Sequence, residues 1–416
     1  MAQMEATHGQ HNRNPIFALL IGDAISLTGS SLTSLAIPWF VLQTTGSAAK
    51  TGVAAAVTVV PVIIAGTLGG TVVDRIGLKR ASVIGDAASG FAVALIPLLY
   101  VTFGLPLWLL LILAFLRTLL DEPGGAARLS LVPNVVSLAD MQLDRVNSFC
   151  QMVRRGTQTA GPLLAGVLIA AVGPSNVLWI DAASFWFSAA IVAIAVPDAT
   201  HSREEGASEP GYFAGLAEGW KFIRGHHLLL TLLVVSATIN LLVAPLLLVV
   251  LPVYAKRTFG SAINLGLMLA GFAVGTLAGT ALYGIVANRV PRRGIYVGGI
   301  LVSAAGFLLL TPVSHLFIAV TALIILGLGI GPVDPLLLTV AHERVPAQLR
   351  GRFFGLMRAV AWIVMPVGLL VTGYLLQTIG LRITVTATAG LYLIFSLSLL
   401  VTPTLRQMEQ VSGSID

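Results

Sequence analysis

Charged residues are scarce in this chain of 416 residues, where Asp, Glu, Lys and Arg make up 10% and hydrophobic residues make up 56%. Soluble domains carry about 25% charged residues, so this chain has too little polar surface to keep a compact body of its size in water. The composition excludes a soluble enzyme, and we expect the chain to lie in a lipid bilayer.

Several chemical groups are also missing. The one cysteine, Cys150, excludes an internal disulfide framework and a cysteine-based metal site. The seven histidines do not show metal-ligand spacing, so no metal is expected. No G-x-x-x-x-G-K-S/T phosphate loop occurs, which excludes ATP as the direct energy source. We therefore expect a protein that is not an enzyme and that needs no cofactor.

Long apolar segments dominate what the chain does contain. A membrane-spanning helix needs about 20 mostly apolar residues, and cutting the sequence at its charged and turn-forming clusters leaves twelve such segments. They cover residues 16–42, 51–73, 81–101, 105–126, 147–172, 177–196, 228–254, 265–287, 295–311, 316–341, 353–376 and 384–401. The sequence therefore predicts an all-α membrane protein with twelve transmembrane helices.

The distribution of Lys and Arg predicts the orientation of these helices. Most basic residues fall in alternate loops, among them Lys79, Arg128 and Arg293, and few fall in the opposite set of loops. The positive-inside rule then places both termini in the cytoplasm of a bacterial-type inner membrane. Topology accounts for the net charge of +6, so a nucleic-acid partner is not expected.

The two halves of the chain resemble each other. Sliding the sequence along itself aligns Thr44, Gly46 and Ser47 with Thr258, Gly260 and Ser261, and Asp121 with Asp334. We predict two pseudo-symmetric six-helix bundles, one over residues 1–196 and one over 228–416, joined by a cytoplasmic linker over 197–227. Parallel repeats of this kind place a site at the midplane between bundles that rock around it. This architecture favours a carrier that works by alternating access, and we expect it to act as a monomer.

Acidic residues inside the spans are candidates for proton coupling, because a charge at the bilayer centre costs about 2.5–3.5 kcal/mol on insertion scales. Asp23 lies about two helical turns into the first span and is the first candidate. A purely structural hydrogen bond, to Ser26 or to another helix, is an equal alternative for it. Asp334 in the tenth span has no cation nearby in the sequence and is the second candidate.

The fourth span carries a cluster of charges. Arg117 and Asp121 are four residues apart and share a helix face, and Glu122 follows directly. We expect Arg117 to hold Asp121 ionised, either as a coupling or gating element or as a static ion pair. Asp121 and Glu122 are the one adjacent acid pair in a span, and without a second acidic cluster they argue against an intramembrane transferase.

One loop motif resembles the signature of the major facilitator superfamily, G-x-x-x-D-R-x-G-R-K/R. It comprises Gly70, Asp74, Arg75, Gly77, Lys79 and Arg80. Leu78 departs from it, since the family usually has a basic residue there. The resemblance implies the twelve-helix major facilitator fold and a cytoplasmic gate, in which Asp74 meets the start of the eleventh span near 351–355.

A second pattern is similar to the Gly-Pro motif of the exporter branches of that superfamily. It comprises Gly156, Gly161, Pro162 and Gly166, with slightly looser spacing. The segments 181–185 and 345–352 look like those of the group that contains macrolide efflux proteins and the enterobactin exporter.

These observations together predict proton-coupled efflux of lipophilic or amphipathic small molecules, such as drugs or secondary metabolites. Few charges and few Asn or Gln residues in the spans favour a hydrophobic solute over a sugar. A lysophospholipid or lipid translocator and an uptake symporter on the same fold stay open as alternatives.

Overall fold

The computed structural model describes residues 13–139, 141–198, 220–311, 314–346 and 349–409. In the first half of the chain, six helices follow one another: α1 (Asn14–Thr45), α2 (Ala48–Ile76), α3 (Leu78–Thr102), α4 (Leu107–Ala139), α5 (Leu143–Val172) and α6 (Pro174–Ala195). Most of the predicted linker, 197–227, lies outside the described residues.

The second half contains six further rods, several of which are interrupted. The first combines α8 (His227–Pro245), the π-helical turn η1 (Leu246–Val250), α9 (Leu251–Tyr254) and a second π-helical turn, η2 (Ala255–Phe259). The others are α10 (Ala262–Val286), α11 (Arg292–Leu309), α12 (Leu316–Ile330) with α13 (Val333–Arg344), α14 (Arg350–Ile363) with α15 (Met365–Thr378), and α16 (Leu381–Val401). A short 3-10 helix, η4 (Pro403–Glu409), follows.

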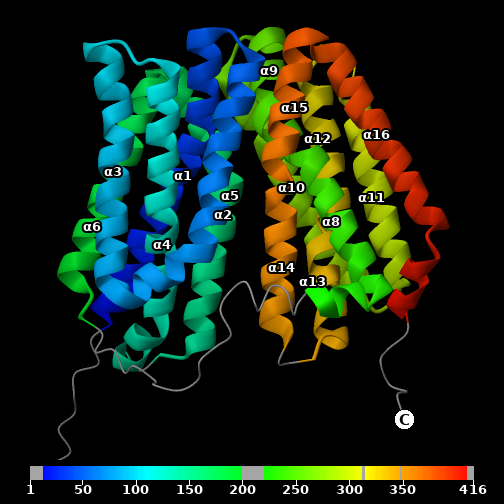
Figure 1. The fold of residues 1–416 in the computed structure, drawn as a ribbon, viewed down its shortest axis with the longest axis horizontal. Helices are drawn as coiled ribbons and strands as arrows, with labels where there is room; N and C mark the ends of the chain where they lie inside the picture. The colour runs from blue at the N-terminus through cyan, green and yellow to red at the C-terminus, as the bar shows by residue number, and fades with distance from the viewer. Residues whose placement is uncertain (1–12, 140, 199–219, 312–313, 347–348, 410–416) are drawn as a thin grey trace, which may run out of the picture.

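The helices form two bundles that stand side by side (Figure 1). Helices α1 to α6 pack among themselves, and so do α8 to α16. The two bundles meet mainly where α2 packs against α15 and α5 against α10. We call the end where α1 begins and η4 lies the terminal face, and the other end the opposite face.

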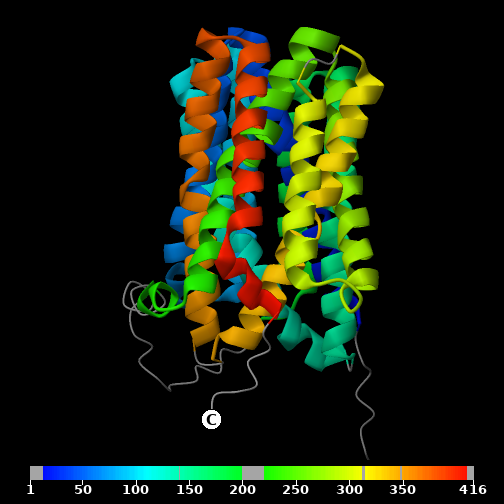
Figure 2. The same ribbon diagram turned by 90° about the vertical axis from the view of Figure 1, so that its right-hand side faces the viewer.

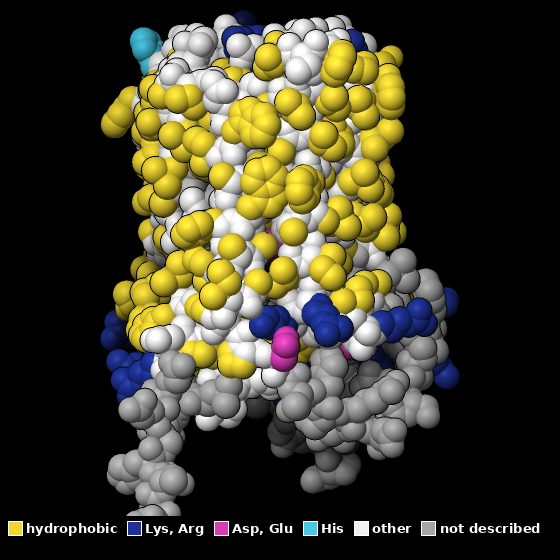
Figure 3. Space-filling model, turned by 90° about the vertical axis from the view of Figure 1, so that its left-hand side faces the viewer, with side chains coloured by type: hydrophobic (Ala, Val, Ile, Leu, Met, Phe, Trp, Pro, Cys, Tyr) yellow, Lys and Arg dark blue, Asp and Glu magenta, His cyan; other side chains and the backbone are white. Residues whose placement is uncertain are grey.

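Ten of the predicted spans are helices long and apolar enough to cross a membrane, counted over the described residues. The remaining two, α4 and α5, run alongside them (Figure 1). Both are interrupted by charged side chains, Arg117, Asp121 and Glu122 in α4 and Arg154 and Arg155 in α5. Hydrophobic side chains cover the outer surface of the first bundle, and Lys and Arg gather below that band near the terminal face (Figure 3).

The predicted repeat appears in the local geometry of the two halves. Helix α1 ends at Gly46 with a φ of 65°, and the corresponding rod of the second half ends at Gly260 with a φ of 68°. This left-handed conformation is nearly free of cost for glycine alone. The next residue, Ser47 or Ser261, then caps the following helix with its side-chain oxygen. Equivalent positions of the repeat therefore build equivalent turns.

Glycines allow the two bundles to touch near the opposite face. A Cβ atom added to Gly52 of α2 would lie 2.6 Å from the Leu369 carbonyl oxygen of α15. One added to Gly166 of α5 would lie 2.9 Å from the Cα of Gly266 of α10. Because only glycine permits such close approach of two backbones, these two crossings join the halves at this end.

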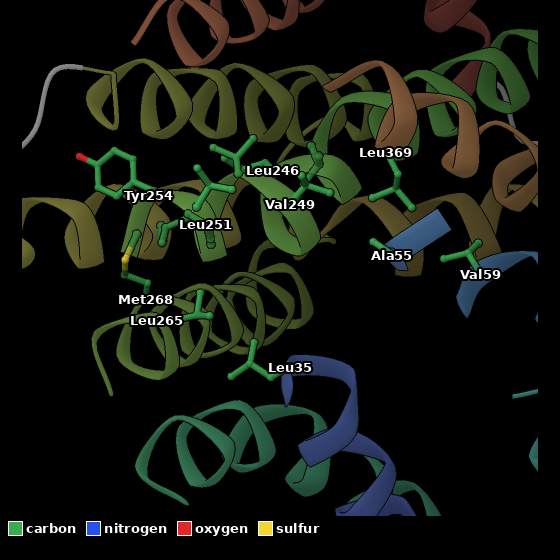
Figure 4. Close-up of a cluster of buried hydrophobic side chains, with 14 of the residues drawn as sticks. Leu35, Ala55, Val59, Leu246, Val249, Leu251, Tyr254, Leu265, Met268 and Leu369 are labelled. Atoms are coloured by element: carbon green, nitrogen blue, oxygen red, sulfur yellow. The ribbon is translucent and has the colours of Figure 1, made fainter. Parts of the chain in front are cut away.

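Apolar side chains continue the contact between the bundles below these crossings. Figure 4 shows Leu35 of α1 and Leu265 of α10, together with Ala55 of α2 and Leu369 of α15. All four belong to one buried cluster that contains residues from both halves. The core is thus shared between the bundles toward the opposite face.

Helix α4 corrects one prediction. The expected fourth span ended at residue 126, and Arg128 was assigned to a loop, but α4 continues to Ala139. Arg128 therefore lies within the helix, and its side chain is 2% exposed. Arg128, which the sequence places beyond the end of the span, thus belongs to a buried charge network.

Candidate functional site: a charged cavity between the bundles

A cavity of about 730 Å³ lies between the bundles, within the range typical of small-molecule sites. Its walls come from α1, α2, α4 and α5 of the first half, and from Leu248, Arg358, Trp362 and Met365 of the second half. A smaller cavity of about 270 Å³, formed mainly by α1, α5, η1 and α10, shares Ser34, Pro38 and Leu248 with it. Most of the ionisable groups line the larger cavity, and the smaller one is mostly apolar, with Arg155 as its charged lining residue.

Arg128 is the centre of the first charge cluster. Its guanidinium forms an ion pair with Asp86 of α3 and donates hydrogen bonds to Ser188 of α6 (3.2 Å) and Ser26 of α1 (3.1 Å). Its Nε lies 3.3 Å from Asp23 Oδ1. The Ser188 hydroxyl also donates to Asp86, at 2.6 Å. One arginine therefore ties together four helices of the first bundle.

Asp23 connects this cluster to α5. Besides Arg128, it contacts Arg154, whose NH2 group lies 3.5 Å from both carboxylate oxygens. The Arg154 side chain is 27% exposed and lines the cavity, whereas that of Asp23 is 8% exposed. The Asp23 carboxylate therefore faces two guanidinium groups. Of the two structural partners expected for Asp23, a residue of another helix is present, namely Arg154 of α5. Ser26 does not bond to Asp23 but accepts a hydrogen bond from Arg128.

A second cluster surrounds Arg117. Its NH2 group lies 3.8 Å from Asp121, one turn along α4, which confirms the predicted pair. It lies closer, at 3.5 Å, to Asp181 of α6, which is fully buried and accepts a hydrogen bond from Thr33. The guanidinium also stacks 5.3 Å from the centre of the Phe185 ring. Ser30 donates to Asp121 at 3.2 Å, so both acids are held by Arg117 and a hydroxyl.

Glu122 differs from the other acids of this region. It lines the cavity, and within the described residues it forms neither an ion pair nor a side-chain hydrogen bond. On the opposite wall, the Arg358 guanidinium lies 5.6 Å from the centre of the Trp362 ring. A half-buried carboxylate without a bound partner is thus available to a molecule in the cavity.

Asp334 lies within the tenth predicted span but has different surroundings from the acids of the first bundle. It lies in the first turn of α13, and its side chain is exposed. It has no ion-pair partner among the described residues. Asp121 and Asp334 therefore occupy equivalent positions of the sequence repeat but have different surroundings.

The gate motif lies at the terminal face. Gly70 is part of α2, and Gly77, with a φ of 93°, forms the turn between α2 and α3. The Lys79 Nζ lies 3.7 Å from Oδ1 of Asp198, which is at the start of the predicted linker. Asp74, Arg75 and Arg80 are exposed, and Asp74 has no ion pair or side-chain hydrogen bond within the described residues. The expected contact of Asp74 with the start of α14 is not made in this conformation.

The Gly-Pro motif of α5 faces three different surroundings. Gly161 packs so closely on α1 that an added Cβ would overlap Ser31. Pro162 lines the smaller cavity, and Gly166 forms the crossing with α10. Gly156 is exposed, and nothing lies within 4 Å of a Cβ placed there. Three of the four residues thus shape the contacts of α5.

Sequence reasoning missed Arg128 as a site residue and did not place Asp86, Arg154 or Asp181 in the charge network beside the cavity. Their partners are far away in sequence, so no local spacing pairs them. The available signal was their polarity inside long apolar helices, which marks a functional candidate by itself.

Comparison with known proteins agrees with this architecture. The family model described as transmembrane secretion effector matches residues 11–414. The multidrug efflux pump Tap of Mycobacterium tuberculosis is 32% identical over 408 residues, which cover 96% of each chain. Macrolide efflux protein A of Streptococcus pyogenes is 23% identical over 372 residues, or 88% of this chain and 90% of that protein.

The fold also matches solved structures. A crystal structure of a mutant of the nucleoside transporter NupG superimposes with a TM-score of 0.74 at 12% identity. The match covers 94% of this chain and 99% of that one. The two-bundle arrangement is therefore a known transporter fold.

Proposed function

This chain belongs to the transmembrane secretion effector family of the major facilitator superfamily, and from that premise we propose that it exports lipophilic or amphipathic small molecules in exchange for protons. The resemblance identified from sequence is thereby confirmed, and the chain is a multi-pass membrane transporter, not an enzyme. The names of its relatives, which are multidrug and macrolide efflux proteins, support export as the direction.

The solute path runs through the cavity of about 730 Å³. The glycine crossings of α2 with α15 and of α5 with α10 join the bundles near the opposite face. At the terminal face, Asp74 forms no ion pair or side-chain hydrogen bond with the second half within the described residues. This arrangement supports a state that is closed at the opposite face, from which the bundles rock as rigid bodies to release the solute.

One observation carries the proposal of proton coupling. The buried network of the first bundle holds four carboxylates against three guanidiniums: Asp23, Asp86, Asp121 and Asp181 against Arg117, Arg128 and Arg154. When all of them are ionised, one negative charge is left without a counter-charge, so the network as a whole becomes neutral when it binds one proton. Such an excess carboxyl group in an apolar interior is typical of proton relays.

Asp23 is the proton site within this network. Protonation removes the charge that holds Arg154, whose guanidinium is free to turn into the cavity, while Arg128 keeps its contacts with Asp86, Ser188 and Ser26. Proton binding at Asp23 therefore changes the charge at the cavity wall without dismantling the bundle. Asp334 and Asp121 are secondary candidates, and Arg117 acts by positioning Asp121.

The orientation proposed for the chain has the terminal face in the cytoplasm of a bacterial inner membrane. Lys and Arg gather at this face (Figure 3), as the positive-inside rule requires. The cavity is then loaded from the cytoplasm, which suits an exporter. Each chain contains a complete cavity, so the protein acts as a monomer.

Uptake of tetraphenylphosphonium, a lipophilic cation, into proteoliposomes with an acidic lumen tests the function. We expect the wild-type protein to accumulate the cation until the pH gradient is dissipated with an uncoupler. The Asp23→Asn variant should lose gradient-driven accumulation but keep solute exchange without a gradient. Asp144→Asn, which makes the same change on an exposed residue of α5, serves as control.

The outcomes separate the alternatives. Accumulation that is equal in the Asp23→Asn variant and the wild type contradicts the assignment of Asp23. Movement of labelled lysophospholipid in place of the cation favours a lipid translocator, and cation movement in the same direction as protons favours a symporter.

A further inference from the structure

A third cavity lies on the outer surface of the second bundle, away from the path between the halves. It measures about 640 Å³ and is formed where the start of α11 meets the end of α16 and η4. Figure 2 faces this side of the molecule, with α11 in yellow and α16 and η4 in red near the terminal face. This surface faces the bilayer at the depth where the helices leave it.

One end of the groove is basic. The Arg293 guanidinium donates one hydrogen bond to the Leu400 carbonyl oxygen at 2.6 Å, and its other N–H groups have no hydrogen-bond partner among the described residues. Arg406 is exposed and forms no ion pair in the described part of the chain. Glu409 also lines the groove and accepts a hydrogen bond from the Arg293 backbone N–H at 2.9 Å. Two guanidiniums against one carboxylate leave a net positive charge.

The rest of the groove is apolar and open. Val297, Leu301 and Leu400 line it, together with Gly294 and Gly298, which lie one turn apart on α11. Nothing lies within 4 Å of a Cβ placed on Gly298. The missing side chains leave a trough along α11 that begins beside the arginines and runs toward the hydrocarbon region.

We propose that this groove binds an anionic phospholipid, with its phosphate between Arg293 and Arg406 and one acyl chain along Gly298 and Leu301. Guanidinium groups bind phosphate through charge-assisted hydrogen bonds, and basic pockets at this depth select acidic headgroups. The apolar trough next to the charges fits a lipid better than a free phosphate ion. The site is independent of the solute cavity, and the inference needs only that the chain spans a membrane.

Binding of cardiolipin to the full-length protein in detergent, measured by native mass spectrometry and by thermal shift, tests this site. We expect cardiolipin to bind more tightly than phosphatidylcholine. The Arg293→Gln/Arg406→Gln variant should bind it about tenfold to thirtyfold more weakly, as expected for two lost charges near the surface. Arg382→Gln, which removes an exposed basic residue at the opposite face, should have no effect.

Arg293 also donates a hydrogen bond to the Leu400 carbonyl oxygen, so its replacement can affect the fold. Two further variants therefore test the site without changing Arg293. Gly298→Leu fills the trough without changing charge, and it should weaken cardiolipin binding but not inorganic phosphate binding. Glu409→Gln should leave cardiolipin binding unchanged or strengthen it. Equal binding of cardiolipin and phosphatidylcholine, or unchanged cardiolipin binding by both the Gly298→Leu and the Arg406→Gln variants, would overturn the proposal.

Discussion

Buried arginines are costly, and the partners of Arg128 explain why this one is tolerated. Desolvation of an isolated charge costs several kcal/mol, and only good geometry with additional hydrogen bonds offsets it. Arg128 contacts two carboxylates and two hydroxyl groups from α1, α3 and α6. Among the described residues, every fully buried charged side chain lies in the first bundle. The first half therefore carries the electrostatic part of the mechanism.

Truncation of Arg128 is expected to destabilise the protein. The Arg128→Leu change leaves Asp86 buried without its counter-charge, and breaking a buried pair in this way costs about 3–5 kcal/mol. Thermal unfolding in detergent measures the loss, with Arg145→Leu on an exposed position of α5 as control. Adding Asp86→Asn to Arg128→Leu should recover part of the stability. A double variant that is less stable than Arg128→Leu alone would contradict this explanation.

Glu122 is expected to determine charge selectivity. It is the cavity acid without a partner among the described residues, so a cationic solute can pair with it without displacing an internal contact. Glu122→Gln should weaken transport of tetraphenylphosphonium roughly tenfold and leave a neutral lipophilic solute of similar size unaffected. Equal losses for both solutes would point to a structural role instead.

At the scale of elements, hydropathy predicts the apolar parts of the helices well, but it does not predict how far a helix extends into a polar segment. The twelve-span pattern and the repeat follow from apolar length and from Gly46, Ser47 and their counterparts. The end of α4 was misplaced because a charge such as Arg128 marks a helix end when its partners are unknown. The pairing of Arg117 with Asp181 depends on how α4 and α6 pack, and no local sequence pattern encodes that contact.

The glycine crossings are expected to control closure at the opposite face. A larger side chain at Gly266 has no room, because Gly166 of α5 lies directly against it. Gly266→Val should therefore open this end, whereas Gly284→Val on the same helix, where nothing lies within 4 Å, should not.

Labelling of a cysteine placed in the cavity reports whether the crossing between α5 and α10 is closed. In a Cys150→Ser background, Ser34→Cys reports access of a membrane-impermeant thiol reagent from each side of the membrane. We expect faster labelling from the opposite face in the Gly266→Val variant. Identical labelling of the two valine variants would show that the crossing does not control access.

At the scale of the whole molecule, the halves share a fold but differ in chemistry. The second bundle buries neutral polar pairs, such as Ser303 with Tyr392 at 2.8 Å, where the first buries ion pairs. In the mechanism that we propose, one half holds the protonation network, and the other contributes apolar walls and the Arg358–Trp362 contact to the cavity. Rocking of the two halves would then convert a change of charge in one half into a change of access for the solute.

Proton flux driven by the solute alone tests this coupling most directly. Proteoliposomes loaded with tetraphenylphosphonium and an internal pH dye are diluted into solute-free buffer at equal pH, with valinomycin and potassium to fix the membrane potential. We expect the lumen to acidify as the cation leaves, in wild-type vesicles and in the Asp144→Asn control but not in the Asp23→Asn variant. Solute exit from wild-type vesicles without any change in internal pH would contradict proton-coupled export.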